Sequence, residues 1–163
     1  MSSRTILQLT CFLVFALSAQ SSNVQSQTDQ GIQIVEHSQI QLTIDTMTTA
    51  FSARNIEGIL ATYEPNAVVV GQPGKPVTGT PALRELFKQF MALDPKFTFT
   101  SQEVVQAGDI ALHFNTWKMS GKSPEGTTVE QGGLSVVVLR KQPDGRWLMV
   151  IDNPFGDNIL LKK

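Results

Sequence analysis

The chain has 163 residues, with 13 Lys and Arg against 14 Asp and Glu. This near balance excludes a general electrostatic affinity for nucleic acid or for an anionic membrane. The only cysteine, Cys11, lies in an apolar N-terminal run. The remainder of the chain therefore offers no disulfide, no thiolate nucleophile and no cysteine-bound metal.

The N-terminus has the pattern of a secretory signal. Arg4 precedes an apolar run over residues 6–17, which falls within the roughly 7–15 residues of a signal core and below the roughly 20 of a membrane span. Small residues suited to cleavage follow it. We expect a signal peptide over residues 1–21, a flexible polar leader over 22–33 and one domain over 34–158, in a periplasmic or secreted protein with no membrane contact after cleavage. A buried N-terminal helix is the alternative interpretation.

Apolar spacing predicts three helices in the first half of the domain. The first begins at Ser38, which opens a capping box of the S-x-x-Q form. The second is capped by Asn55 and ends at Pro65. The third has Thr80 as its N-cap, directly before a proline. A loop rich in Gly and Pro is expected at residues 71–76, between the second and third helices.

The remaining segments favour strands and tight turns. Apolar or alternating runs predict strands at residues 67–70, 97–100, 110–119, 129–140 and 147–153. A Pro-Asp-Gly turn joins the last two. This order indicates an α+β domain, in which three helices cover one face of a curved antiparallel sheet and enclose a conical cavity.

One predicted strand carries an unusual polar set on a single face. Its alternation directs Ile110, Leu112 and Phe114 to one side. The other side carries Ala111, His113, Asn115 and Trp117. A face with His, Asn and Trp side by side suits a partly buried cavity better than a packed core or open solvent. The strand therefore predicts a pocket for a small-molecule ligand.

Three segments carry a resemblance to a known family. They are residues 55–69, the run Gly79-Thr80-Pro81-Ala82-Leu83, and Asp144-Gly145-Arg146-Trp147. With them the chain resembles the NTF2-like superfamily, in its ketosteroid-isomerase-like branch that includes the SnoaL-like and DUF4440 proteins. The resemblance covers residues 39–155 and implies a cone-shaped fold. It also implies a homodimer formed through the apolar convex face of the sheet. Such domains include isomerases, cyclases, dehydratases, hydrolases and non-catalytic modules.

The same resemblance argues against a standard ketosteroid isomerase. Gly71 stands where those enzymes carry the general-base aspartate, while Met47 and Val137 stand where they carry the tyrosine and the protonated aspartate of the oxyanion hole. Without these groups the main sources of rate are missing. The cavity positions that the resemblance implies are Ala111, His113, Asn115, Trp117, Ser135, Val137, Leu139, Val150 and Asp152.

Asp152 and His113 are the candidates for proton transfer. A carboxylate at the end of an apolar strand, facing a cavity, has a raised pKa and can act as a general base. His113 could orient or partner it, because imidazole titrates near neutrality. The bland alternatives are an Asp152 that caps the following turn and a His113 satisfied within the core.

The other candidates would bind or orient a ligand. Asn115 and Ser135 could hydrogen-bond a ligand carbonyl, and Trp117 could form an aromatic wall. Val137 and Val150 would line the cavity, and Tyr63 resembles a core tyrosine of the family.

Two functions stay open. One is a cofactor-independent isomerase, lyase or hydrolase acting on a small, largely apolar, oxygenated molecule. The other is a non-catalytic binding or scaffold module. No metal site is expected, because the sequence has no H-x-H or H-x-x-x-H spacing. No cofactor is expected either, since the chain lacks G-x-G-x-x-G and Walker-type loops.

Overall fold

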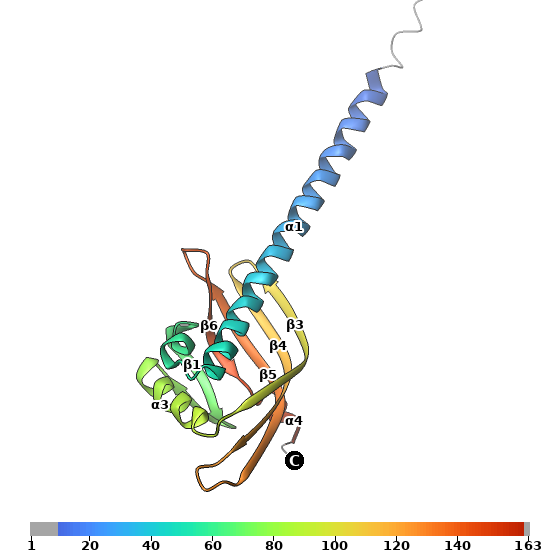
Figure 1. Ribbon diagram of the computed structural model, residues 1–163. Coiled ribbons are helices and arrows are strands. Elements are labelled where there is room, and N and C mark those ends of the chain that lie inside the picture. The colour runs from blue at the N-terminus through green and yellow to red at the C-terminus, as the bar shows by residue number, and fades with distance from the viewer. Residues whose placement is uncertain (1–9, 162–163) are drawn as a thin grey trace, which may run out of the picture. The chain divides into compact units, whose positions relative to one another are not determined.

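The computed structural model describes the backbone of residues 10–161 and the side chains of residues 30–160 (Figure 1). Residues 1–9 of the predicted signal peptide, and the side chains of its remainder, lie outside the described residues. The chain divides into two units, Met1–Glu36 and His37–Lys163. The second unit contains the sheet and all of the site residues. No helix among the described residues is long and apolar enough to cross a membrane.

Helix α1 (Thr10–Ser52) begins well before the predicted capping box at Ser38. The prediction of a helix start at Ser38 is therefore wrong. Residues 22–37 contain no proline and one glycine, Gly31, so nothing in them ends a helix. The segment predicted as a leader has helical backbone, and its flexibility stays a prediction. Within the second unit the expected apolar stripe is confirmed, since Ile40, Ile44 and Phe51 are buried.

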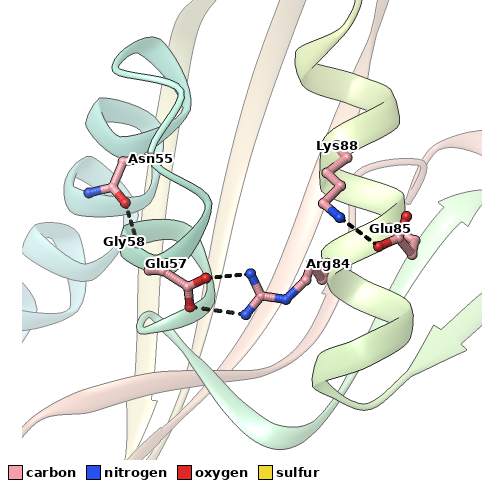
Figure 2. Close-up of polar contacts among 6 residues, drawn as sticks. All are labelled: Asn55, Glu57, Gly58, Arg84, Glu85 and Lys88. Carbon is pink, nitrogen blue, oxygen red and sulfur yellow. Dashed lines mark hydrogen bonds and ion pairs between the residues drawn. The ribbon is translucent and has the colours of Figure 1, made fainter.

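Helices α2 (Ile56–Leu60) and α3 (Thr80–Met91) pack side by side. The predicted cap of α2 is confirmed, because the Gly58 amide donates to the Asn55 side chain over 3.0 Å (Figure 2). The two helices are joined by Arg84, which donates to both carboxylate oxygens of Glu57 (Figure 2). The predicted cap of α3 is wrong by one residue. Gly79 occupies the cap with φ 86°, a conformation that glycine adopts readily.

Six strands form one sheet in the order β2-β1-β6-β5-β4-β3. Their bounds are β1 (Tyr63–Gln72), β2 (Lys75–Thr78), β3 (Lys96–Ala107), β4 (Ile110–Lys122), β5 (Thr128–Lys141) and β6 (Trp147–Asn153), followed by a short helix α4 (Asn158–Leu161). All neighbouring pairs are antiparallel except β1 and β6, which run parallel.

Two predictions about the β1 region are wrong. Pro65 does not end a helix, because β1 has already begun at Tyr63. A proline is tolerated there because the register of β1 on β6 is interrupted between Tyr63 and Val68. The predicted loop at residues 71–76 is instead the tip of a hairpin, with β2 folding back on β1 after Gly74 at φ 76°.

The predicted architecture is confirmed within the second unit: helices cover one face of a curved, unclosed sheet (Figure 1). The core lies between those layers, and its most deeply buried side chains are Ile40, Ile59, Leu83, Leu139, Trp147 and Met149. A register shift between Phe99 and Ser101 interrupts the ladder of β3 on β4. Such bulges bend a strand, which helps the sheet to curve over the helices.

Candidate functional site

A cavity of about 100 Å³ lies between the helices and the concave face of the sheet. It is several times larger than the roughly 10–15 Å³ that one water needs. Most of its walls are aromatic or aliphatic side chains. The polar side chains that line it are Thr48, Tyr63, Asn115, Gln131, Ser135 and Asp152. An apolar cavity with a few convergent polar groups is the usual form of a small-molecule site.

The predicted inward face of β4 is confirmed by burial. Ala111, His113, Asn115 and Trp117 are all at most 8 % exposed, while the intervening residues are more open. The pattern holds because β4 pairs with β5 without interruption from Ile110 to Lys122. In this register Asn115 lies opposite Ser135. Both line the cavity, as does Trp117.

Asp152 lies in the cavity wall and is held by a tyrosine. The Tyr63 hydroxyl, from β1, donates a hydrogen bond of 2.7 Å to Asp152 Oδ2, and both side chains are buried. Burial raises the pKa of Asp152 to about 6, although the Tyr63 hydrogen bond acts in the opposite direction. Burial and the neighbouring carboxylate raise the pKa of Tyr63 well above its usual range. Asp152 is therefore a carboxyl that can gain or lose a proton near neutral pH.

His113 has a different environment from the one predicted. It is fully buried but does not line the cavity. Its Nε2 lies 3.1 Å from Oε1 of Gln41 on α1, and Nε2 of Gln41 in turn donates to Asp45. Gln41 therefore presents an acceptor, so Nε2 of His113 carries the proton and Nδ1 is left with no partner within the described part of the chain. Burial lowers the pKa of His113, while Asp45 opposes the shift.

The structure does not bring His113 and Asp152 into contact. Val137 pairs with His113 on one side and with Asp152 on the other. The two side chains are thus two strands apart, roughly 9–10 Å. Each has its own hydrogen-bond partner. Among the described residues, the partner of Asp152 is Tyr63, a residue that the sequence had indicated only as a core tyrosine.

Ala111, Leu139 and Val150 are the other predicted lining residues that lie outside the cavity. Strict alternation places Val150 on the same face as Asp152. The register of β5 on β6 shifts between Val138 and Leu139, so an extra residue intervenes on β6. As a result Met149 and Asp152 both point inward, three positions apart, and the parity argument fails at Val150.

Asn115 contributes a polar atom with unmet hydrogen-bonding capacity. Its side chain is 6 % exposed, and Oδ1 has no hydrogen-bond partner among the residues that the structure describes. Native proteins pair most buried polar atoms, so an orphan of this kind in a cavity wall points to a ligand or a water. Trp117 is fixed by its indole, which donates to the Pro154 carbonyl over 2.8 Å.

Aromatic side chains that sequence reasoning missed form part of the cavity wall. Phe97 and Phe99 are stacked at 6.2 Å, Trp117 lies 6.3 Å from Phe97, and Phe155 meets Trp117 edge-on at 6.3 Å. The alternation of Phe97 and Phe99 on β3 was a usable signal, because Phe99 pairs with Trp117. Phe155 follows the last strand, where no periodic pattern places it.

The structure offers no catalytic polar group at Met47, Gly71 and Val137, the three positions at which a ketosteroid isomerase carries its base and oxyanion hole. Met47 and Val137 line the cavity as apolar walls. At Gly71, a Cβ atom would lie 2.6 Å from Leu86 Cδ1, so Leu86 fills the space that an aspartate would need. Within residues 30–160, no cluster of three or more His, Cys, Asp or Glu could hold a metal ion.

Comparison with known families agrees with this geometry. The model of the SnoaL-like domain matches residues 44–149. The chain belongs to the SnoaL-like domain family. No curated protein matches the chain.

Solved structures of the NTF2-like family share the fold. A protein provisionally named an aromatic ring hydroxylase, from Novosphingobium aromaticivorans, has a TM-score of 0.67 at 21% identity over 74% of this chain and 87% of its own. An NTF2-like protein provisionally named a dehydratase, from Streptomyces avermitilis, has 0.65 at 18% identity over 73% and 94%. A ketosteroid isomerase-like protein from Erwinia carotovora atroseptica has 0.60 at 23% identity over 70% and 90%. These identities establish the fold alone.

Proposed function

We propose that this SnoaL-like domain binds a small, largely apolar, oxygenated molecule in its cavity and transfers a proton through Asp152. The observation that supports this most is the buried Asp152 carboxyl, held by Tyr63 in an otherwise apolar wall. Burial brings its pKa to about 6, so it is mostly ionised at neutral pH and can accept a proton. Asn115 and Ser135 line the same cavity and would orient the ligand.

The proposed chemistry is cofactor-independent isomerisation, dehydration, cyclisation or hydrolysis. Tyr63 would stabilise the ionised form of Asp152 and keep one oxygen fixed, leaving the carboxylate aimed at the ligand. His113 has no part in the proposed proton transfer, because it lies outside the cavity and hydrogen-bonds to Gln41. Asp152→Asn should then abolish turnover while the fold is retained. Full activity in that variant would exclude Asp152 as the base.

A second function is a binding or scaffold module without chemistry. It is favoured by the apolar character of Met47, Gly71 and Val137, which leaves the cavity without an oxyanion hole of the isomerase type. Native mass spectrometry of the protein purified from its own host shows whether it carries a ligand. A discrete small-molecule adduct supports the pocket role, and turnover of that molecule then decides between the two functions.

We further propose that the protein is a homodimer formed through the outer face of the sheet. Val105, Leu112, Val138 and Ile151 follow one another in register across four strands on that face. Val105 is 50% exposed and Ile151 42% exposed, which is unusual for an apolar row. Sedimentation should give twice the monomer mass, and Ile151→Lys should give a monomer. A monomeric native protein would contradict this proposal.

The secreted or periplasmic location is likewise a proposal. It is supported by the signal pattern of residues 1–21. The intact mass of the protein isolated from its host should correspond to a chain that begins near residue 22. A mass that includes the N-terminal methionine would contradict export by a cleaved signal.

A further inference from the structure

The polar side chains of the cavity wall offer hydrogen-bond acceptors to a ligand. Asp152 is a carboxylate at neutral pH, Asn115 Oδ1 is without a partner within the described residues, and Ser135 adds hydroxyl lone pairs. The Tyr63 hydroxyl donates to Asp152, while the Asn115 amide and the Ser135 hydroxyl can donate as well as accept. The carboxylate alone can only accept, so a ligand that matches it carries an N–H or O–H donor on its polar end.

Asp152 and Ser135 lie close enough together to share one group, whereas Asn115 is two strands away from Asp152. Asn115 and Ser135 face each other across β4 and β5, where opposing Cβ atoms are about 4.5–5.5 Å apart. Asp152 lies diagonally from Ser135, because it pairs with Val137 two residues further along β5. Diagonal neighbours are roughly 7–8 Å apart, within reach of a bridging head group.

Asp152 has no positive partner in the cavity. No Lys, Arg or His is among the residues that line it, as far as the described part of the chain shows. The titratable groups near Asp152 are Tyr63 from β1, in direct contact, and His113 from β4, beyond Val137. Neither α1 nor α3 contributes a charged side chain to the lining. An ionised carboxylate in such a place is most stable beside a cation.

The aromatic rings in the cavity wall also favour positive charge. Four of them follow one another at ring separations of 6.2–6.3 Å, in the order Phe99, Phe97, Trp117 and Phe155. The faces of aromatic rings are electron-rich and attract organic cations, with Trp the strongest of them. The size of the cavity, about 100 Å³, suits a single ring, since an engineered apolar cavity of about 150 Å³ holds benzene.

We propose that the ligand is a small organic cation, a one-ring molecule whose primary ammonium group donates its N–H bonds to Asp152 and Ser135. This rests on the ligand-binding part of the proposed function and not on turnover, and it narrows the polar end of the ligand to a basic nitrogen. The ammonium ion donates to the carboxylate and neutralises the one charge in the cavity.

Benzylamine and benzyl alcohol form a matched pair of probes, because they have the same ring and linker and differ in the charge of the head group. Their dissociation constants are measured by calorimetry on the full chain and on Asp152→Asn. Asp109→Asn serves as the control, since it removes the same charge from an exposed turn that does not line the cavity. We expect benzylamine to bind the native protein and the control at least tenfold more tightly than benzyl alcohol, and this preference to disappear in Asp152→Asn.

The pH dependence of binding gives a further test of the charge of the ligand. Binding of benzylamine should weaken about tenfold between about pH 7.5 and pH 5, as Asp152 gains its proton, while binding of benzyl alcohol should stay nearly constant. Equal or tighter binding of the alcohol by the native protein would overturn the cationic ligand and leave the pocket role standing. Binding of neither probe at about 10 mM would overturn both.

Discussion

Replacing Asp152 by asparagine should make the protein more stable at neutral pH, by an amount that depends on pH. The buried carboxyl has a pKa of about 6 in place of 3.8. Because the folded-state pKa is raised, the folded protein holds the proton more tightly than the unfolded chain. Its contribution is fully favourable below the unfolded value and is lost as the pH rises through about 6.

The magnitude follows from the size of the shift. A difference of about two pKa units corresponds to on the order of 3 kcal/mol, at 1.36 kcal/mol for each unit. Asparagine is neutral and keeps an oxygen that can accept the Tyr63 hydroxyl. The free energy of unfolding of Asp152→Asn minus that of the native protein should therefore rise by about 2–3 kcal/mol between about pH 4 and pH 7.5. At the upper pH the melting temperature should differ by roughly 10 °C.

Urea denaturation followed by circular dichroism, at pH steps across this range, measures the difference directly. The contributions of the other titrating groups cancel in the difference between the two free energies of unfolding, because both proteins contain those groups. Any fixed cost or gain from the amide adds a constant and leaves the pH dependence intact. A difference that does not change with pH would refute the reasoning, since it would mean that the carboxyl is ionised as easily in the folded protein as in the unfolded chain.

Substitutions at other positions test different parts of the structure. Burial lowers the pKa of His113, so the unfolded chain takes up the proton first as the pH falls below about 6.5, and the native protein loses stability. His113→Gln should remove this loss. The same dependence of the free energy of unfolding on pH in the two proteins would contradict this. Leu139→Ala should cost about 2–5 kcal/mol in urea denaturation, whereas Leu160→Ala, at a side chain 82% exposed, should cost almost nothing. Gly121→Ala should destabilise by about 1–3 kcal/mol, because its Cβ would clash with the backbone carbonyl oxygen of Leu93. Gly71→Ala should cost less, because its Cβ would meet only the flexible end of the Leu86 side chain; equal losses in the two variants would contradict this.

The local sequence pattern was sufficient to predict which side chains point inward wherever the sheet register is unbroken. The inward face of β4 could be predicted because thirteen consecutive pairs with β5 preserve strict alternation. Asn115, Trp117, Ser135 and Val137 accordingly line the cavity as expected, and so does Asp152. The order of helices and strands was equally readable from apolar spacing.

The predictions that failed concern features that depend on contacts between residues distant in the sequence. Val150 was wrongly predicted to face the cavity because a bulge in β6 inserts one residue, and no residue type on that strand indicates the bulge. Parity assigned His113 to the correct face but could not show that Gln41, on α1, would cover it. The bond from Tyr63 to Asp152 joins residues 89 positions apart, across two strands that pair in parallel, which no local pattern encodes.

The central claim is that Asp152 is a buried carboxyl in a ligand cavity, and carbon NMR of its side-chain carboxyl tests this most directly. A pH titration of selectively labelled protein, assigned by the loss of the signal in Asp152→Asn, gives the pKa of that one group. We predict titration near pH 6, with a shift to lower pH when benzylamine is bound. Titration near the ordinary value of 3.8, unchanged by the probe, would contradict the account.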